Sequence, residues 1–165
     1  MKMNTFTALK EHMERTFHTI KTIRENFLKL ISDMSIEALN EIPVGFNNNI
    51  MWNFGHIIAS QQILCYKFSD NKPLIADCYI SDYRNGTRPE HVIDKVEFEI
   101  LKSNLLSTID RTETDLRNNV FENFKPKLLD FGLYLTDIQD VIPYIAIHDA
   151  IHLGYSLALK RMIQN

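Results

Sequence analysis

The sequence is poor in glycine and proline, the residues that most often interrupt regular secondary structure. Only 5 glycines and 5 prolines occur among 165 residues, so few positions favour tight turns or break a helix. This scarcity disfavours a protein built mainly from short strands and loops. It favours long helices.

Cysteine is equally scarce. Cys65 and Cys78 are the only two, and their separation does not match the paired spacings of zinc-binding motifs. A framework of disulfides is therefore not indicated. We expect both residues to be reduced, buried thiols.

An excess of positive charge and a long apolar run are also missing. The formal net charge is −3 and the sequence pI is about 6.1, so the electrostatic attraction that draws proteins to nucleic acids or anionic membranes is absent. No run approaches the ~18 apolar residues of a membrane span, and residues 1–5 lead into a charged helical pattern instead of a signal segment. These absences predict a soluble cytoplasmic protein that binds neither nucleic acid nor membrane.

What the chain does contain suits a single helical domain covering residues 1–165. A chain of this length can bury roughly 70% of its unfolded surface in one core, and 45% of its residues are hydrophobic. Four stretches space their apolar residues by three and four, which lines one face of a helix. They cover residues 5–31, 49–68, 92–118 and, from either 136 or 140, to 162.

Two of these stretches have irregularities. In the first, the apolar stripe has a gap between Ile20 and Phe27, which we assign to Ile23. In the fourth, Thr136 has the spacing of a capping residue, but Pro143 lacks a backbone N–H and predicts either a kink or a start delayed to about Asp140.

The segments between the stretches differ in character. Residues 43–49 combine proline, glycine and three asparagines, a strong loop signal that also supplies helix caps. Residues 69–90 form the longest irregular segment, and loops of that length are often functional or cover a site. Residues 121–135 fit either a short extended piece or a packed loop. The simplest architecture is an all-α, antiparallel four-helix bundle with a long loop between helices two and three.

Two histidines lie on the apolar face of the last helix. His148 and His152 are four residues apart, so their side chains stack on one face, which Ile145 and Leu159 mark as the core side. A buried polar group without a partner costs about 1–3 kcal/mol. A bound metal ion would satisfy both rings, because neutral imidazole is a common ligand of zinc, nickel, copper and iron.

A third histidine, His56, lies on the apolar face of the second helix. We therefore predict that His56, His148 and His152 bind one divalent metal ion. The competing interpretation is that they are core histidines satisfied by hydrogen bonds. His12, His18 and His91 lie on polar helix surface or in a loop and are not predicted ligands.

Two segments resemble the signatures of the DinB-like family. Residues 43–57 have an Asn-rich start leading to Trp52 and a Gly55–His56 pair, and residues 148–155 form a His-acid-x-x-His-x-Gly run. The turn at Arg84–Thr87 between them is similar to the family's connecting segment, and the order of the four helices also fits. Two departures, Asp149 for a frequent Glu and Tyr155 for a frequent Gln, leave the histidines unchanged.

The resemblance implies an antiparallel four-helix bundle, often dimeric, with a three-histidine site for nickel, zinc or a related ion. Some relatives transfer low-molecular-weight thiols or isomerise substrates with their help, while many have no established reaction. The implied ligands here are His56, His148 and His152. The expected partners are a small-molecule substrate, for which such a thiol is a candidate, and a second copy of the chain in a homodimer.

The function stays open between two classes. Three protein ligands leave coordination positions free, which is typical of a catalytic site for metal-assisted hydrolysis or thiol transfer. The alternative is a non-enzymatic ligand-binding or stress-response protein with a structural or vestigial histidine cluster. A zinc peptidase is disfavoured, because Asp149 replaces the general-base glutamate of the H-E-x-x-H motif and no ligand-type histidine follows. Asp149 points about 100° away from His148, so we expect a supporting or surface residue.

Overall fold

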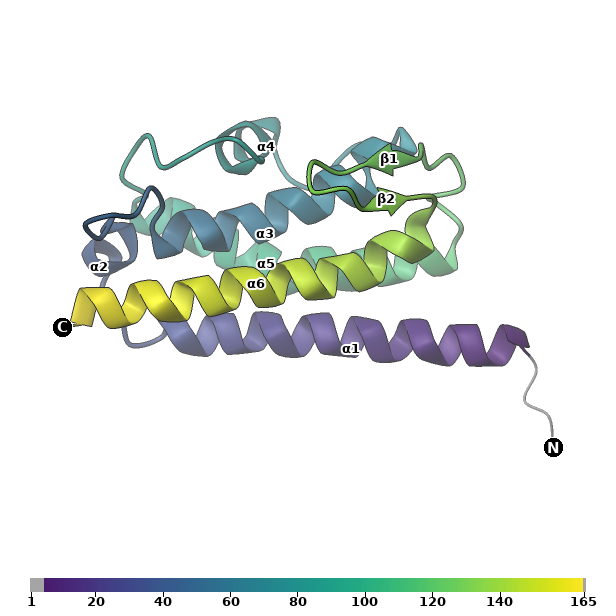
Figure 1. Cartoon of the computed structure of the whole chain (residues 1–165), viewed down its shortest axis with the longest axis horizontal. Helices are drawn as coiled ribbons and strands as arrows, with labels where there is room; N and C mark the ends of the chain where they lie inside the picture. The colour runs from purple at the N-terminus through teal and green to yellow at the C-terminus, as the bar shows by residue number, and fades with distance from the viewer. Residues whose placement is uncertain (1–4, 165) are drawn as a thin grey trace.

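The computed structural model describes residues 5–164, of which most are helical. Figure 1 shows the arrangement. The elements in chain order are α1 (Thr5–Ile31), α2 (Ile36–Asn40), α3 (Ile50–Cys65), a 3-10 turn (Lys67–Ser69), α4 (Asp77–Tyr83), α5 (Lys95–Arg117), β1 (Lys127–Leu128), β2 (Tyr134–Leu135) and α6 (Ile138–Gln164). The all-α prediction is therefore confirmed at the level of a mostly helical fold. Expectations for residues 1–4 and for the side chain of Phe6 lie outside the described part.

The four long helices α1, α3, α5 and α6 lie side by side, and their directions follow from contacts between matching ends (Figure 1). Lys160 near the end of α6 donates to the carbonyl of Leu30 near the end of α1, so these helices are parallel. Tyr66 at the end of α3 bonds to Asp115 near the end of α5, so this pair is parallel too. The antiparallel prediction is right for α1 with α5 and for α3 with α6, and wrong for the other two pairs.

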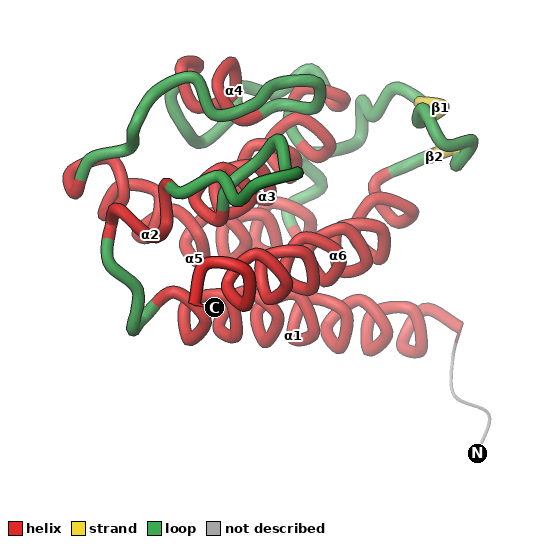
Figure 2. Tube along the Cα trace, turned by 60° about the vertical axis from the view of Figure 1, so that its left-hand side comes forward, coloured by secondary structure: helices red, strands yellow, loops and turns green. Residues whose placement is uncertain are grey.

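The parallel pairs arise because residues 66–94 carry the chain back along the length of α3. This connection lies with the β1–β2 hairpin on the α3 side of the molecule, away from α1 (Figure 2). It is not the irregular loop that the sequence predicts at 69–90, because it contains α4. Tyr83 at the end of α4 packs so closely on Gly55 that a Cβ added there would lie 2.5 Å from the tyrosine ring.

Helix α3 is the central element. Its start is capped as predicted, because the side chain of Asn49 accepts the backbone N–H of Trp52 at 2.7 Å. The helix ends at Cys65, earlier than the predicted residue 68. All its residues except Ile63 are buried, because α4 covers the face that a helix with a single apolar stripe would expose.

The segment after α5 resolves the open alternative at 121–135. Strands β1 and β2 pair antiparallel, with Lys127 opposite Leu135, and Gly132 takes a positive φ of 93° in the turn. Helix α6 then begins at Ile138 and continues through Pro143 without the delayed start. Its first backbone N–H groups bond to Asp137, so the cap lies one residue after the predicted Thr136.

The buried faces correct two predicted stripes and one cysteine. On α1 the gap between Ile20 and Phe27 is filled by fully buried Arg24, while Ile23 is only half-buried. On α6, Asp149 is fully buried and Tyr155 is exposed, so the deepest face is rotated from the predicted one. Cys65 is buried as expected, but Cys78 is exposed on α4.

The core consists of two apolar clusters with a polar layer between them on each long helix. On α1, for example, the apolar neighbours of Arg24 in the two clusters are Ile20 and Phe27. We call this layer the Arg24 layer and define it as Arg24, Gln61, Thr108 and Asp149, all buried. Among residues 5–164, no helix is long and apolar enough to cross a membrane.

Candidate metal centre

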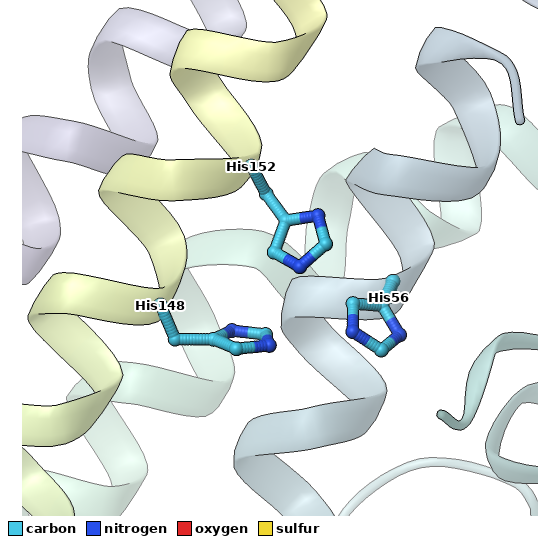
Figure 3. Close-up of side chains that lie close together, drawn as sticks. All are labelled: His56, His148 and His152. Atoms are coloured by element: carbon cyan, nitrogen blue, oxygen red, sulfur yellow. The ribbon is translucent and has the colours of Figure 1, made fainter. Parts of the chain in front are cut away.

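The structure brings the three predicted residues together. His56 comes from α3, and His148 and His152 come from the facing side of α6 (Figure 3). One ring nitrogen from each lies within 4.8 Å of the other two, and the ring centroids are 4.5 to 5.1 Å apart. His12 and His18 are exposed on α1, and His91 pairs with Glu97, so none of them joins this group.

His56 is held by the connection that follows α3. Its Nδ1 lies 2.6 Å from the backbone carbonyl oxygen of Tyr83. A carbonyl can only accept, so Nδ1 carries the proton, and the lone pair of Nε2 accepts from the Ser60 hydroxyl at 3.3 Å. The indole of Trp52 stacks on the ring at a centroid distance of 4.5 Å and donates its own N–H to Thr87. Segment 69–90 therefore orients this histidine.

His152 is held by a side chain of α3. Its Nδ1 lies 2.7 Å from the Oδ1 atom of Asn53. The amide is oriented by its other end, because Nδ2 of Asn53 donates to the carbonyl of Asn49 at 2.7 Å. Nδ1 of His152 must then donate, and Nε2 is again the nitrogen with the lone pair.

His148 is partly exposed, with 14% of its side chain accessible. Its Nδ1 lies 3.6 Å from Oδ1 of Asp149, which is longer than an ordinary hydrogen bond. That oxygen is buried and has no hydrogen-bond partner. The ring of Tyr144 also lies near His148, at a distance of 5.8 Å between the ring centroids.

Burial keeps two of the rings neutral. Desolvation, followed by the charge of neighbouring His148, lowers the pKa of His56 to about 4. Desolvation, again followed by His148 and then by His56, lowers the pKa of His152 to about 3. At neutral pH both rings are therefore deprotonated, which is the form that binds a metal ion.

The three histidines line a cleft of about 710 Å³, within the usual range of small-molecule sites. The β1–β2 hairpin and the end of α3 supply much of the remaining wall. The ring nitrogens of the three histidines therefore face a lined cleft and not open solvent. Besides Trp52 and Tyr144, the apolar lining residues are Ile63, Leu64, Phe68, Leu128, Leu129 and Phe131, and the wall also contains Lys127.

The donor set fits a divalent ion that prefers nitrogen. It offers three imidazoles and no carboxylate, a composition that suits zinc or nickel better than magnesium or calcium. The unpartnered Oδ1 of Asp149 beside His148 supports this fit, because metal-binding histidines usually donate their second N–H to such an oxygen.

Sequence reasoning missed three residues that support the site. Arg24 had a usable signal, since it lies four residues after Ile20 and three before Phe27, on the buried stripe. Asn53 precedes His56 by one helical turn, which was a weaker signal. The Tyr83 carbonyl had none, because every residue type carries that group.

Comparison with known proteins agrees with the two signature segments. The family model of the DinB superfamily matches residues 19–156, a stretch that includes all three histidines. No curated protein matches the chain.

Proposed function

The chain belongs to the DinB superfamily, and we propose that it is a metal-dependent protein in which His56, His148 and His152 bind one zinc or nickel ion through their Nε2 atoms. The observation that carries this proposal is that the two nitrogens of a ring have different roles. Nδ1 of His56 and of His152 is bonded to a fixed acceptor, while one nitrogen of every ring lies in a common group. Within this group the protein contact to a lone pair is that of the Ser60 hydroxyl, 3.3 Å from Nε2 of His56, and a metal ion would replace it.

The proposal extends to an enzyme acting on a small molecule, by hydrolysis or by transfer of a low-molecular-weight thiol. A bound ion would act as a Lewis acid that favours deprotonation of water or of a thiol. Phe68, Leu129 and Phe131 line the cleft, and this apolar wall would strengthen electrostatic interactions near a bound ion. A cytoplasmic location, a homodimer and the four-helix-bundle arrangement of the family belong to the same proposal.

Metal binding is tested first on the purified protein. We expect one equivalent of zinc or nickel to bind near pH 7.5 and to raise the melting temperature, since binding to the folded state alone stabilises it. His148→Ala and His152→Ala should abolish uptake while the chain stays folded. His91→Gln removes an exposed histidine outside the group and should bind like the wild type. Absence of stoichiometric metal in the wild type, with no thermal shift, contradicts the proposal.

Enzymatic activity needs a separate assay. The zinc-loaded and nickel-loaded proteins are offered an activated ester, and an electrophile together with a simple thiol. We expect turnover of one of these two probes, either the ester or the electrophile with its thiol. This turnover should disappear in His148→Ala and persist in His91→Gln. Turnover that survives in His148→Ala arises elsewhere, and a loaded protein inactive towards both probes contradicts the assigned reaction classes while leaving metal binding intact.

A further inference from the structure

Arg24 makes an unusual set of contacts for a core residue. It is fully buried on α1, and its guanidinium reaches the other three long helices. It donates to Oδ2 of Asp149 on α6 at 2.8 Å, to the carbonyl of Leu105 on α5 at 2.7 Å, and to Gln61 on α3 at 3.1 Å. A planar fork held from several sides is fixed in orientation.

The two oxygens of Asp149 therefore have different environments. Oδ2 accepts from Nε of Arg24. Oδ1 is equally buried, has no hydrogen-bond partner, and lies 3.6 Å from Nδ1 of His148. A buried carboxylate oxygen without a donor is costly, and the His148 ring is the donor it faces.

A second buried aspartate shows what a carboxylate with only a stabilising role looks like. Asp115 is buried on α5 and also accepts from an arginine Nε, that of Arg111. Its other oxygen accepts from the hydroxyl of Tyr66 at 2.7 Å. Both oxygens of Asp115 are thus satisfied within the protein, whereas Asp149 keeps one oxygen for His148.

We propose that Arg24 and Asp149 act together as positioning residues that fix His148 as a metal ligand. Arg24 holds Oδ2 and so turns Oδ1 towards Nδ1 of His148. That oxygen can only accept, so the proton of the neutral ring lies on Nδ1, and Nε2 is left with its lone pair. All three histidines then have the same tautomer, each selected by a different acceptor: the Tyr83 carbonyl, Asn53 and Asp149. This inference rests on the proposed metal site.

The tautomer of His148 is measured directly in the wild-type, metal-free protein. Nitrogen-15 NMR at pH 8, where an ordinary imidazole is neutral, distinguishes a protonated Nδ1 from a protonated Nε2. The signal is assigned by its loss in His148→Gln. We expect the proton on Nδ1. A proton on Nε2 overturns the proposal, and this measurement needs neither a variant of Asp149 nor bound metal.

The second test compares Asp149→Asn with its matched control, Asp115→Asn. Arg24 requires the amide oxygen of the new asparagine, so the amide NH₂ faces His148 and favours the opposite tautomer. Removing such a supporting group typically weakens metal affinity by about 10-fold to 100-fold. We expect this loss in zinc affinity for Asp149→Asn, a shift of its His148 proton to Nε2, and neither change in Asp115→Asn.

The outcomes separate the two proposals. Equal zinc affinity in Asp149→Asn, Asp115→Asn and the wild type overturns the positioning role while leaving the metal site intact. If Asp149→Asn fails to fold, the tautomer in the wild type decides the question. A wild type that binds no zinc but carries the proton on Nδ1 contradicts the proposed function and leaves the orientation of His148 by Asp149 standing.

Discussion

The Arg24 layer and the histidine group are both polar clusters within otherwise apolar helix faces, and they differ in how completely their atoms are bonded. In the Arg24 layer the guanidinium donates to acceptors on α3, α5 and α6. In the histidine group, Nδ1 of His56 and of His152 donates to a protein acceptor and each Nε2 keeps a lone pair. The lone pair of His56 has only the Ser60 hydroxyl, at 3.3 Å, as a partner. Among the side-chain atoms of the Arg24 layer, only Oδ1 of Asp149 lacks a hydrogen-bond partner. The layer therefore holds helices together, whereas the histidine group keeps capacity for binding.

The comparison is tested most severely by Arg24→Met. This change leaves the Asp149 carboxylate buried without its cation, and breaking a buried pair in this way costs about 3–5 kcal/mol. We expect that loss in the free energy of unfolding of the metal-free protein, measured by urea denaturation. Arg111→Met removes an arginine whose side chain is 62% exposed and should cost about 1 kcal/mol or less. Equal losses in the two variants argue against a structural role for the Arg24 layer.

The histidine group should respond in the opposite way to His148→Leu. The metal-free variant is expected to unfold within about 1 kcal/mol of the wild type, because the replaced ring is partly exposed and makes no hydrogen bond of ordinary length. With zinc at 100 times the dissociation constant, the wild type gains about 2.7 kcal/mol, and the variant should gain nothing. A large destabilisation of the metal-free variant makes His148 a structural residue instead.

Substitutions at two helical glycines should change the stability by smaller amounts. A Cβ at Gly55 would lie 2.5 Å from the Tyr83 ring, so Gly55→Ala should displace α4 and cost about 1–3 kcal/mol. It should also weaken zinc binding, because the Tyr83 carbonyl orients His56. Nothing lies within 4 Å of a Cβ at Gly154, so Gly154→Ala should stabilise α6 by about 0.5–1 kcal/mol. Unchanged zinc affinity in Gly55→Ala contradicts the role of α4.

A further modest effect is the pH dependence of stability near neutrality. The folded protein holds the pKa of His56 at about 4 and that of His152 at about 3, below the value of about 6.5 in an unfolded chain. The unfolded state therefore binds more protons below pH 6.5, and stability falls as the pH drops from there towards 4. Between pH 7 and pH 6 we expect a loss of about 1.4 kcal/mol in the metal-free protein, about 0.7 kcal/mol from each ring.

The same experiment on His152→Gln supplies the control, because it removes one of the two titrating rings. Its unfolding free energy should depend less steeply on pH over the same interval. An identical slope in variant and wild type indicates that His152 is not the group responsible. Zinc affinity should fall with the pH in the wild type, since protons compete for the ligand nitrogens.

Much of the helical structure and the identity of the three candidate ligands could be predicted from the sequence. The cap that residues 43–49 supply, the helix predicted at 92–118 and the shared face of His148 and His152 follow from local chemistry and the helical period. The errors occurred where a residue's environment depends on a distant segment. The apolar pattern favours Ile23 over Arg24 as the buried residue of α1. An arginine is buried in a core only when acceptors on other helices surround it, and the local pattern does not reveal them.

The sequence by itself determined which residues share one face of each helix, since a period of 3.6 residues is a property of the local backbone. Only the tertiary structure decided that α3 and α5 run parallel, that α4 packs on Gly55, and that three imidazoles from two helices each bring one nitrogen to a common group. These features depend on acceptors brought from far along the chain. One of them, the carbonyl of Tyr83, is a backbone group that no side-chain pattern reveals.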